Sequence, residues 1–279
     1  MRVAVSNIAW SEGRRDEAAD LLARLGVRGI EVAPTKIWDD PLSASRDEVT
    51  AVLDYWRGRE IEIVAMQSLL YGRDDLRVFG PPDVRRRTLD YLLGMVELAG
   101  ALGAGPLVFG SPRQRKAGGL PEEEREEIAA RFFGELGRAA SREGVCLCIE
   151  PNPPEYGTDF VTSVREARAL VDRVGSPGFG LHLDAGGMTL TGEDPRDAVT
   201  DGRDPPRHVH VSEPYLAPVG AGGEAAAGRH RELAEALEAS GYGGWCSIEM
   251  RAVEEGDELE AVRRAVAFTE RIYGDAGPA

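Results

Sequence analysis

Val145-Cys146-Leu147-Cys148-Ile149-Glu150 is the first of four short apolar segments that decide the fold. The others are Gly180-Leu181-His182-Leu183-Asp184, His208-Val209-His210-Val211-Ser212 and Trp245-Cys246-Ser247-Ile248-Glu249. Each segment has the length and the alternation of a β-strand, and each carries a carboxylate or an imidazole at or near its end. If the four strands are adjacent and parallel, their carboxyl ends bring together Glu150, Asp184, His210 and Glu249. Three carboxylates and one imidazole form a mostly oxygen site, which suits Mn²⁺ or Mg²⁺.

The remainder of the chain alternates predicted strands with predicted helices. Four earlier strands are expected at residues 3–6, 29–33, 61–66 and 106–109, and helices at about 16–25, 43–57, 83–102, from 121 onward, and at 163–174, 195–200, 224–240 and 257–273. Eight strand-helix units predict an α/β fold with a parallel sheet, closed as a single (β/α)₈ TIM barrel over residues 1–273, with a C-terminal tail at 274–279. An open doubly wound sheet would need a glycine-rich loop after the first strand, and Val5-Ser6-Asn7-Ile8 is not one.

Composition limits the function classes. The 279 residues include 33 Lys and Arg against 48 Asp and Glu, and the net charge of −15 disfavours nucleic acid and anionic membrane surfaces as partners. No signal peptide or membrane-spanning run is visible, so we expect a cytoplasmic protein. Cys146, Cys148 and Cys246 lie inside predicted strands and are expected to be buried thiols. Whether the chain forms a homo-oligomer stays open.

Three motifs, in order along the chain, resemble the xylose isomerase-like barrel superfamily, in particular its sugar and sugar phosphate isomerase and epimerase branch. The motifs are Ile149-Glu150-Pro151-Asn152, Leu183-Asp184-Ala185-Gly186 and His210-Val211-Ser212-Glu213, and the resemblance spans nearly the whole chain. It implies one divalent metal ion held by Glu150, Asp184, His210 and Glu249. Mn²⁺ is the expected ion, with Mg²⁺, Co²⁺ or Zn²⁺ as alternatives. The resemblance also implies that Glu150 and Glu249 act as the acid/base pair.

The chemistry of such enzymes requires these residue types. A carboxylate removes a proton next to a carbonyl only if the resulting enediolate is stabilised, and a divalent cation provides that stabilisation. Glu150 and Glu249 come from strands separated by two others, so they are expected to flank a small sugar-like substrate. We therefore predict a metal-dependent isomerase or epimerase.

Other functions of the superfamily are weighed against this one. A metal-dependent dehydratase or lyase acting on a cyclic keto-acid or keto-polyol would use much the same ligands and the same first proton abstraction, so it stays open. An apurinic endonuclease-like hydrolase would need many histidines and a basic face, whereas this chain has 4 histidines and a negative charge. A barrel that binds a ligand without chemistry is disfavoured by the complete ligand set.

Further residues are expected around the site. Ketose 3-epimerases of the superfamily carry a histidine and an arginine where this chain has Gly187 and Leu216, so a different substrate is expected. Arg113, Arg115 and Lys116 form a basic cluster in a strand-end loop and are predicted to grip a phosphate or carboxylate of the substrate. The other predicted substrate contacts are Glu155, Gln67, Tyr71 and Arg251, with Trp10 and Trp38 as further candidates for the pocket wall. The residues predicted to support the metal ligands from behind are His182, His208 and Glu31, whereas His230 is predicted to lie on the surface of a helix.

Overall fold

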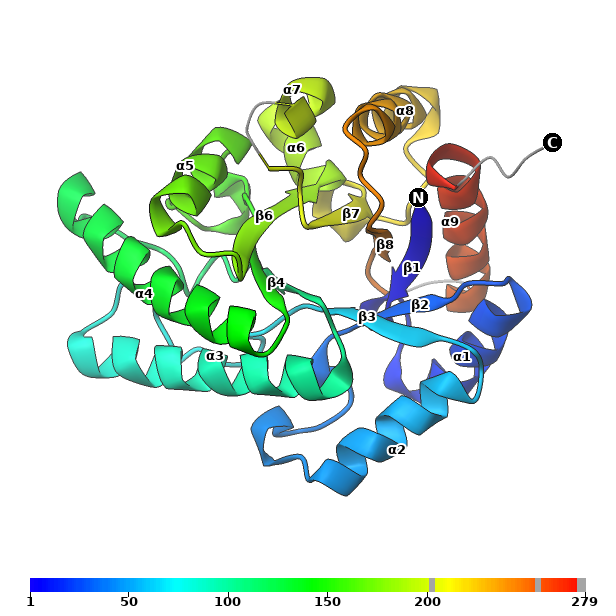
Figure 1. The fold of residues 1–279 in the computed structure, drawn as a ribbon. Helices are drawn as coiled ribbons and strands as arrows, with labels where there is room; N and C mark the ends of the chain where they lie inside the picture. The colour runs from blue at the N-terminus through cyan, green and yellow to red at the C-terminus, as the bar shows by residue number, and fades with distance from the viewer. Residues whose placement is uncertain (201–203, 254–256, 275–279) are drawn as a thin grey trace.

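The strands pair in chain order and close on themselves, which confirms the predicted (β/α)₈ barrel (Figure 1). The computed structural model describes residues 1–200, 204–253 and 257–274. The strands are β1 Arg2–Ser6, β2 Gly29–Val32, β3 Glu62–Met66, β4 Pro106–Phe109, β5 Cys146–Ile149, β6 Phe179–Asp184, β7 His208–Ser212 and β8 Trp245–Glu249. All neighbouring strands are parallel, and β8 pairs with β1 to close the ring. Of the predicted tail at 274–279, all but Gly274 lies outside the described residues.

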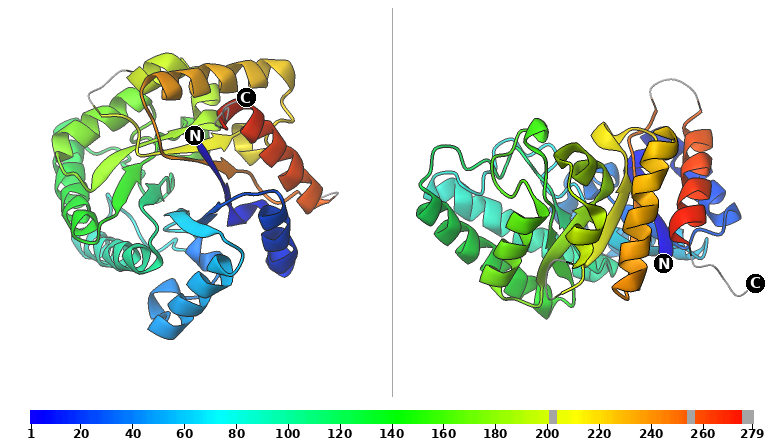
Figure 2. Two further views of the ribbon diagram at one scale, coloured as in Figure 1. Left: turned by 45° about the vertical axis from the view of Figure 1, so that its right-hand side comes forward. Right: turned by 90° about the horizontal axis from the view of Figure 1, so that it is seen from above.

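The helices surround the strands on the outside (Figure 2). They are α1 Arg15–Arg24, α2 Arg46–Arg57, α3 Pro82–Leu102, α4 Glu122–Arg142, α5 Val164–Val174, α6 Ala185–Thr191, α7 Pro195–Thr200, α8 Gly223–Ala239 and α9 Glu258–Tyr273. Short 3₁₀ helices lie at Asn7–Ala9, Glu12–Arg14, Pro34–Lys36, Pro41–Ser43, Pro154–Tyr156 and Pro214–Leu216. Helix α6 was not predicted from the sequence. It starts directly at the end of β6, where the Asp184 side chain accepts a hydrogen bond from Gly187 N and so caps the helix.

Local sequence signals explain where several helices begin. Ser45 and Glu48 form a reciprocal capping box at the start of α2, and the side chains of Ser163 and Asp257 cap α5 and α9. Because these caps satisfy backbone N–H groups that have no partner within the helix, they fix the helix starts close to the predicted positions. Chain segments far apart in sequence also meet, since α9 lies against α1 and β1.

The two faces of the strands differ in character. Val209 and Val211 of β7 point away from the barrel axis into the apolar layer beneath the helices, and both are fully buried. His208 and His210 alternate with them and point inward. The barrel interior is therefore polar along β6 to β8, whereas a small apolar cluster formed by Ala4, Val64 and Ala65 fills it on the other side. Within the described ranges, no helix has the length and apolarity that a membrane span requires.

Candidate metal centre

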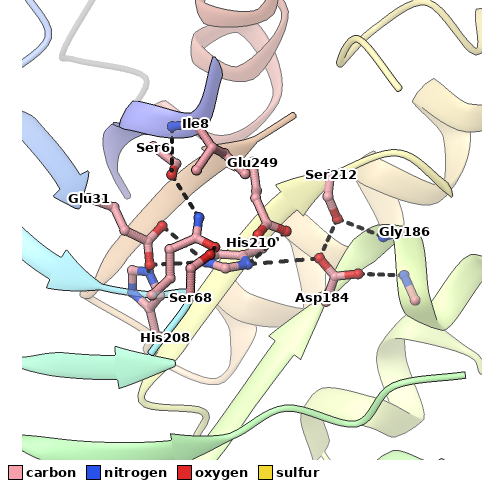
Figure 3. A network of polar contacts seen from close by, with 12 residues as sticks. Ser6, Ile8, Glu31, Ser68, Asp184, Gly186, His208, His210, Ser212 and Glu249 are labelled. Atoms are coloured by element: carbon pink, nitrogen blue, oxygen red, sulfur yellow. Dashed lines mark hydrogen bonds and ion pairs between the residues drawn. The ribbon is translucent and has the colours of Figure 1, made fainter. Parts of the chain in front are cut away.

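The predicted ligands lie at the carboxyl ends of four consecutive strands, β5 to β8. The side-chain ligand atoms of Glu150, Asp184 and His210 all lie within 4.8 Å of one another, together with a ring nitrogen of His182. Nδ1 of His210 is 3.2 Å from Oε2 of Glu249 and 4.0 Å from Oδ2 of Asp184 (Figure 3). The structure thus brings all four predicted side chains into one site, and it adds His182, which the sequence had placed only one layer below them.

Asp184 is held by hydrogen bonds to both of its carboxylate oxygens. Gly187 N donates to Oδ1 at 2.5 Å, and the Ser212 hydroxyl donates to Oδ2. Ser212 Oγ in turn accepts from Gly186 N at 2.9 Å (Figure 3). The sequence analysis did not assign a role to Ser212, although its position two residues after His210 on the same face of β7 would have been a signal. These contacts fix the direction in which Asp184 presents its oxygens.

Gly186 is required by close packing, because a Cβ there would lie 2.7 Å from the backbone of Glu213. A Cβ on Gly187, at the position where related ketose epimerases carry a histidine, would lie 3.0 Å from Oδ1 of Asp184, so a side chain there would need a small shift of that carboxylate.

His210 is held on its other side by Glu31 of β2. Nε2 of His210 lies 3.0 and 3.1 Å from the two carboxylate oxygens of Glu31, and Nε2 of His208 lies 3.4 Å from Oε1 of the same carboxylate. All three side chains are fully buried or nearly so. In a metal site, a carboxylate that holds one ring nitrogen of a histidine leaves the other nitrogen free to bind the ion. Here Glu31 holds Nε2 of His210, and Nδ1 faces Asp184 and Glu249.

His182 has no comparable support. Its ring packs edge-on against that of His210 with centroids 4.1 Å apart, and within the described part of the chain neither of its ring nitrogens has a hydrogen-bond partner. Burial, and then the neighbouring His210 and His208, hold the pKa of His182 well below its usual range. A neutral imidazole beside the carboxylates is a further potential ligand.

The carboxylates of the centre repel one another. Burial raises the pKa of Glu150 to about 8, with contributions from Asp184 and Glu249. Burial and Glu249 likewise raise the pKa of Asp184 to about 6. These shifts follow from placing like charges together away from water, a cost that a bound cation would relieve.

The pKa values of His210 and Glu31 are shifted the other way, toward the charged form of each side chain. Burial opposes a charge on His210, but Glu31 and Glu249 outweigh it and raise the His210 pKa well above its usual range. Burial also opposes ionisation of Glu31, yet His210 and His208 together lower the Glu31 pKa well below normal. A site of several oxygens, one free imidazole nitrogen and excess negative charge fits a divalent ion such as Mn²⁺ or Mg²⁺.

The structure separates the predicted substrate contacts into two groups. Gln67 is buried and donates to Ser6 Oγ at 2.7 Å, so its amide nitrogen is engaged by the end of β1. Tyr71 is 72% exposed, and Glu155 and Arg251 are exposed on the loops after β5 and β8.

Trp10 and Trp38 also lie apart from the ligands. Trp10 is almost fully buried and lines a groove with a volume of about 480 Å³ between α1 and α2, and Trp38 is half-buried. None of the four predicted ligands lines this groove.

Arg115 corrects the prediction of a basic substrate-binding cluster. Its side chain is fully buried, and its guanidinium donates to the backbone carbonyl oxygens of Phe109, Glu150 and Val161. A guanidinium enclosed in this way cannot grip a substrate anion. Arg113 and Lys116 are exposed on the same loop.

His230 was also predicted wrongly. It is 4% exposed rather than on the surface, because it packs inward from α8, with Nδ1 2.7 Å from the Tyr273 hydroxyl and Nε2 3.7 Å from Oε1 of Glu213.

Tyr156, in the loop after β5, contacts the loop after β7. It is half-buried, and its hydroxyl accepts a hydrogen bond from Tyr215 N at 3.0 Å. Burial raises the Tyr156 pKa to about 12, with smaller contributions from Asp184, Glu150 and Glu249. Tyr215 and Leu216 both have positive φ, at 61° and 58°, so the loop after β7 adopts a strained conformation next to Tyr156.

Comparison with known proteins agrees with the observed architecture. The family model described as xylose isomerase-like TIM barrel matches residues 19–272. A search of curated protein sequences gave no significant match.

Among solved structures, the chain is similar to a D-psicose 3-epimerase studied in the presence of D-fructose, at 17% identity, with 98% of this chain and 100% of that chain covered and a TM-score of 0.81. It is also similar to 3-keto-D-glucoside 4-epimerase from E. coli, at 17% identity, 97% and 99% coverage and a TM-score of 0.79. A third similar structure is D-allulose 3-epimerase from Methylomonas sp. in complex with D-allulose, at 18% identity, 98% and 97% coverage and a TM-score of 0.77. At these identities the likeness concerns the fold.

Proposed function

The chain belongs to the xylose isomerase-like TIM barrel family, and on this premise we propose that it is a divalent-metal-dependent isomerase or epimerase of a sugar or sugar phosphate. One observation carries the proposal. Four ligand-type side chains from β5 to β8 converge at the end of the barrel where enzymes of this fold have their active sites, and their mutual repulsion calls for a cation. The similar structures of sugar epimerases support the same reading.

Each residue of the centre has a role in this proposal. Asp184, fixed by Gly187 and Ser212, and His210, fixed by Glu31, would hold the ion through Oδ and Nδ1. Glu150 and Glu249 would complete the ligand set. We propose Mn²⁺ as the native ion, with Mg²⁺, Co²⁺ or Zn²⁺ as substitutes. The bound ion would supply stabilisation of the negative charge that develops on the substrate oxygen as the neighbouring carbon loses its proton.

Proton transfer falls to the two glutamates. In this proposal one of them removes the proton next to the carbonyl, and the other, or the same residue, returns a proton to the carbon skeleton. The Tyr156 hydroxyl accepts from Tyr215 N, so its own hydrogen would be donated to a substrate oxygen in this proposal.

The glycine at position 187 keeps a second candidate function in view. A ketohexose would lack the histidine contact that related epimerases provide from this position. The alternative substrate class is a cyclic keto-acid or keto-polyol. A dehydratase acting on such a substrate would use the same first proton abstraction and then expel a hydroxyl group.

An experiment in D₂O separates these functions. Mn²⁺-loaded protein is incubated with ketohexoses, sugar phosphates and cyclic keto-polyols, and the products are followed by NMR. We expect deuterium at the carbon next to the carbonyl together with a new isomer. Deuterium uptake with an alkene product would instead identify a dehydratase. Absence of both with every substrate, in protein shown by elemental analysis to hold one ion per chain, would contradict the proposal. Asp184→Ala serves as the control that loses the ion.

A further inference from the structure

The buried guanidinium of Arg115 joins three pieces of backbone around the metal centre. Nη1 donates to the carbonyl oxygen of Glu150 at 2.6 Å and to that of Phe109 at 3.4 Å. Nη2 donates to the carbonyl oxygen of Val161 at 3.2 Å. The end of β4, the first residue after β5 and the end of the following loop therefore share one cation.

The loop that Arg115 closes is strained at its far end. Val161 has φ of 57°, a conformation that is unfavourable for a β-branched residue. Its carbonyl oxygen accepts from Asn152 N at 3.2 Å as well as from Arg115, so two donors hold the strained turn against the start of the same loop. This loop carries Tyr156, whose hydroxyl accepts from Tyr215 N of the loop after β7.

Among the residues that the structure describes, the hydrogen-bond acceptors of Arg115 are backbone carbonyl oxygens, and its guanidinium forms no salt bridge. A buried guanidinium is costly unless its donors are satisfied. The donors of Arg115 converge on the backbone that carries Glu150, which points to a role in the site.

The Glu150 carboxylate packs closely against Gly110. A Cβ on Gly110, which follows β4, would lie 2.2 Å from Oε2 of Glu150, so the carboxylate rests against bare backbone. A small movement of the Glu150 backbone would therefore change where its carboxylate points.

We propose that Arg115 is a positioning residue of the metal centre, which holds the backbone of Glu150 so that its carboxylate stays within reach of Asp184 and His210. The inference deepens the proposed function, because it concerns the same centre. It removes Arg115 from the substrate-binding residues and gives it a place in metal binding instead.

The test compares Mn²⁺ affinity in two matched arginine variants. Arg115→Met replaces the guanidinium with an apolar chain that can stay buried. The control is Arg168→Met, since the Arg168 guanidinium on α5 also bonds to backbone carbonyls, those of Ala198 at 2.7 Å, Val199 at 3.0 Å and Asp204 at 3.1 Å. Mn²⁺ titration followed by electron paramagnetic resonance gives the Kd of each protein, and thermal unfolding without metal gives its stability.

We expect Arg115→Met to weaken Mn²⁺ binding by roughly 10–100-fold, the range found when a residue that orients a metal ligand is removed. Arg168→Met should lose stability but keep a Kd within about twofold of wild type, because no metal ligand depends on it. If Arg115→Met does not fold, Arg115→Lys takes its place. A single ammonium cannot serve three carbonyls in the planar geometry of the guanidinium, so the same loss of affinity is expected.

Two results would overturn the role of Arg115 alone: unchanged Mn²⁺ affinity in its folded variants, or an equal loss in the Arg168 control. A wild-type protein that binds no Mn²⁺ would overturn the metal centre, and with it both proposals.

Discussion

Loading the metal-free protein with Mn²⁺ should release about two protons per chain at pH 7. In the metal-free protein, side chains of the centre hold protons, and the ion displaces these protons when it binds. Glu150, with a pKa raised to about 8, carries a proton in about nine-tenths of the molecules at this pH. Asp184, with a pKa raised to about 6, carries one in about a tenth. His210 contributes one more, because its raised pKa keeps both ring nitrogens protonated until the ion takes Nδ1.

The sign of the pH dependence follows from these shifts. Groups whose pKa is raised in the metal-free protein hold protons that compete with the ion, so affinity increases with pH. Around neutrality the increase should be about a hundredfold per pH unit, because about two protons leave per ion. Near pH 9 the release should be smaller by nearly one proton, since Glu150 has by then ionised.

Titration calorimetry in buffers of different ionisation enthalpy measures this release, because the observed heat varies linearly with that enthalpy and the slope gives the number of protons. Glu150→Gln should release about one proton fewer at pH 7. Glu155→Gln, at an exposed position in the next loop, should match wild type. A slope of zero at pH 7, or a release that grows as pH rises, would refute the reasoning.

Three further outcomes are expected. Glu31→Gln should weaken Mn²⁺ binding by roughly 10–100-fold in the same calorimeter, because the ring of His210 loses its carboxylate partner, and wild-type affinity would contradict this. Gly110→Ala should weaken it by about tenfold or more, since the new methyl displaces the Glu150 carboxylate, and a crystal structure with that carboxylate unmoved would show the reasoning to be wrong. The Cys246 thiol, whose pKa burial raises to about 12, should not react with a thiol reagent at pH 8 until the protein is unfolded, and prompt labelling of the native protein would argue against its burial.

The barrel and the convergence of the four predicted ligands could be predicted because both depend on local pattern. Alternation within each strand fixes which residues share a face, and eight strand-helix units leave few topologies. Asp184 pairs with His210 across β6 and β7, and Glu249 pairs with Ser212 across β7 and β8, so closing the barrel was enough to bring these side chains together.

The roles of Arg115 and His230 could not be predicted in the same way. A charged or titratable side chain in a loop or on a helix normally faces water, and sequence alone does not show whether backbone carbonyls converge around it. For Arg115 they do, because the strained turn at Val161 returns the loop to β5. For His230 the deciding partner is Tyr273, 43 residues away on α9.

Helix α6 was missed for a different reason. Gly186 and Gly187 disfavour a helix by propensity, and Asp184 was considered only as a ligand. In the structure the same carboxylate both faces the other predicted ligands and caps the helix, so one residue serves two purposes.

The four predicted ligands lie at the ends of β5 to β8, the second half of the chain, whereas Glu31 of β2 supports His210 from behind. This division bears on how such a protein can evolve. Mutations in the loops after β1 to β3 can reshape the space above the centre while the predicted ion-binding groups, and Arg115 in the loop after β4, stay intact, so new substrates can be explored without an inactive intermediate. A directed-evolution library restricted to the loops after β1 to β3 should accordingly retain more active members than one of equal size spread over the loops after β5 to β8.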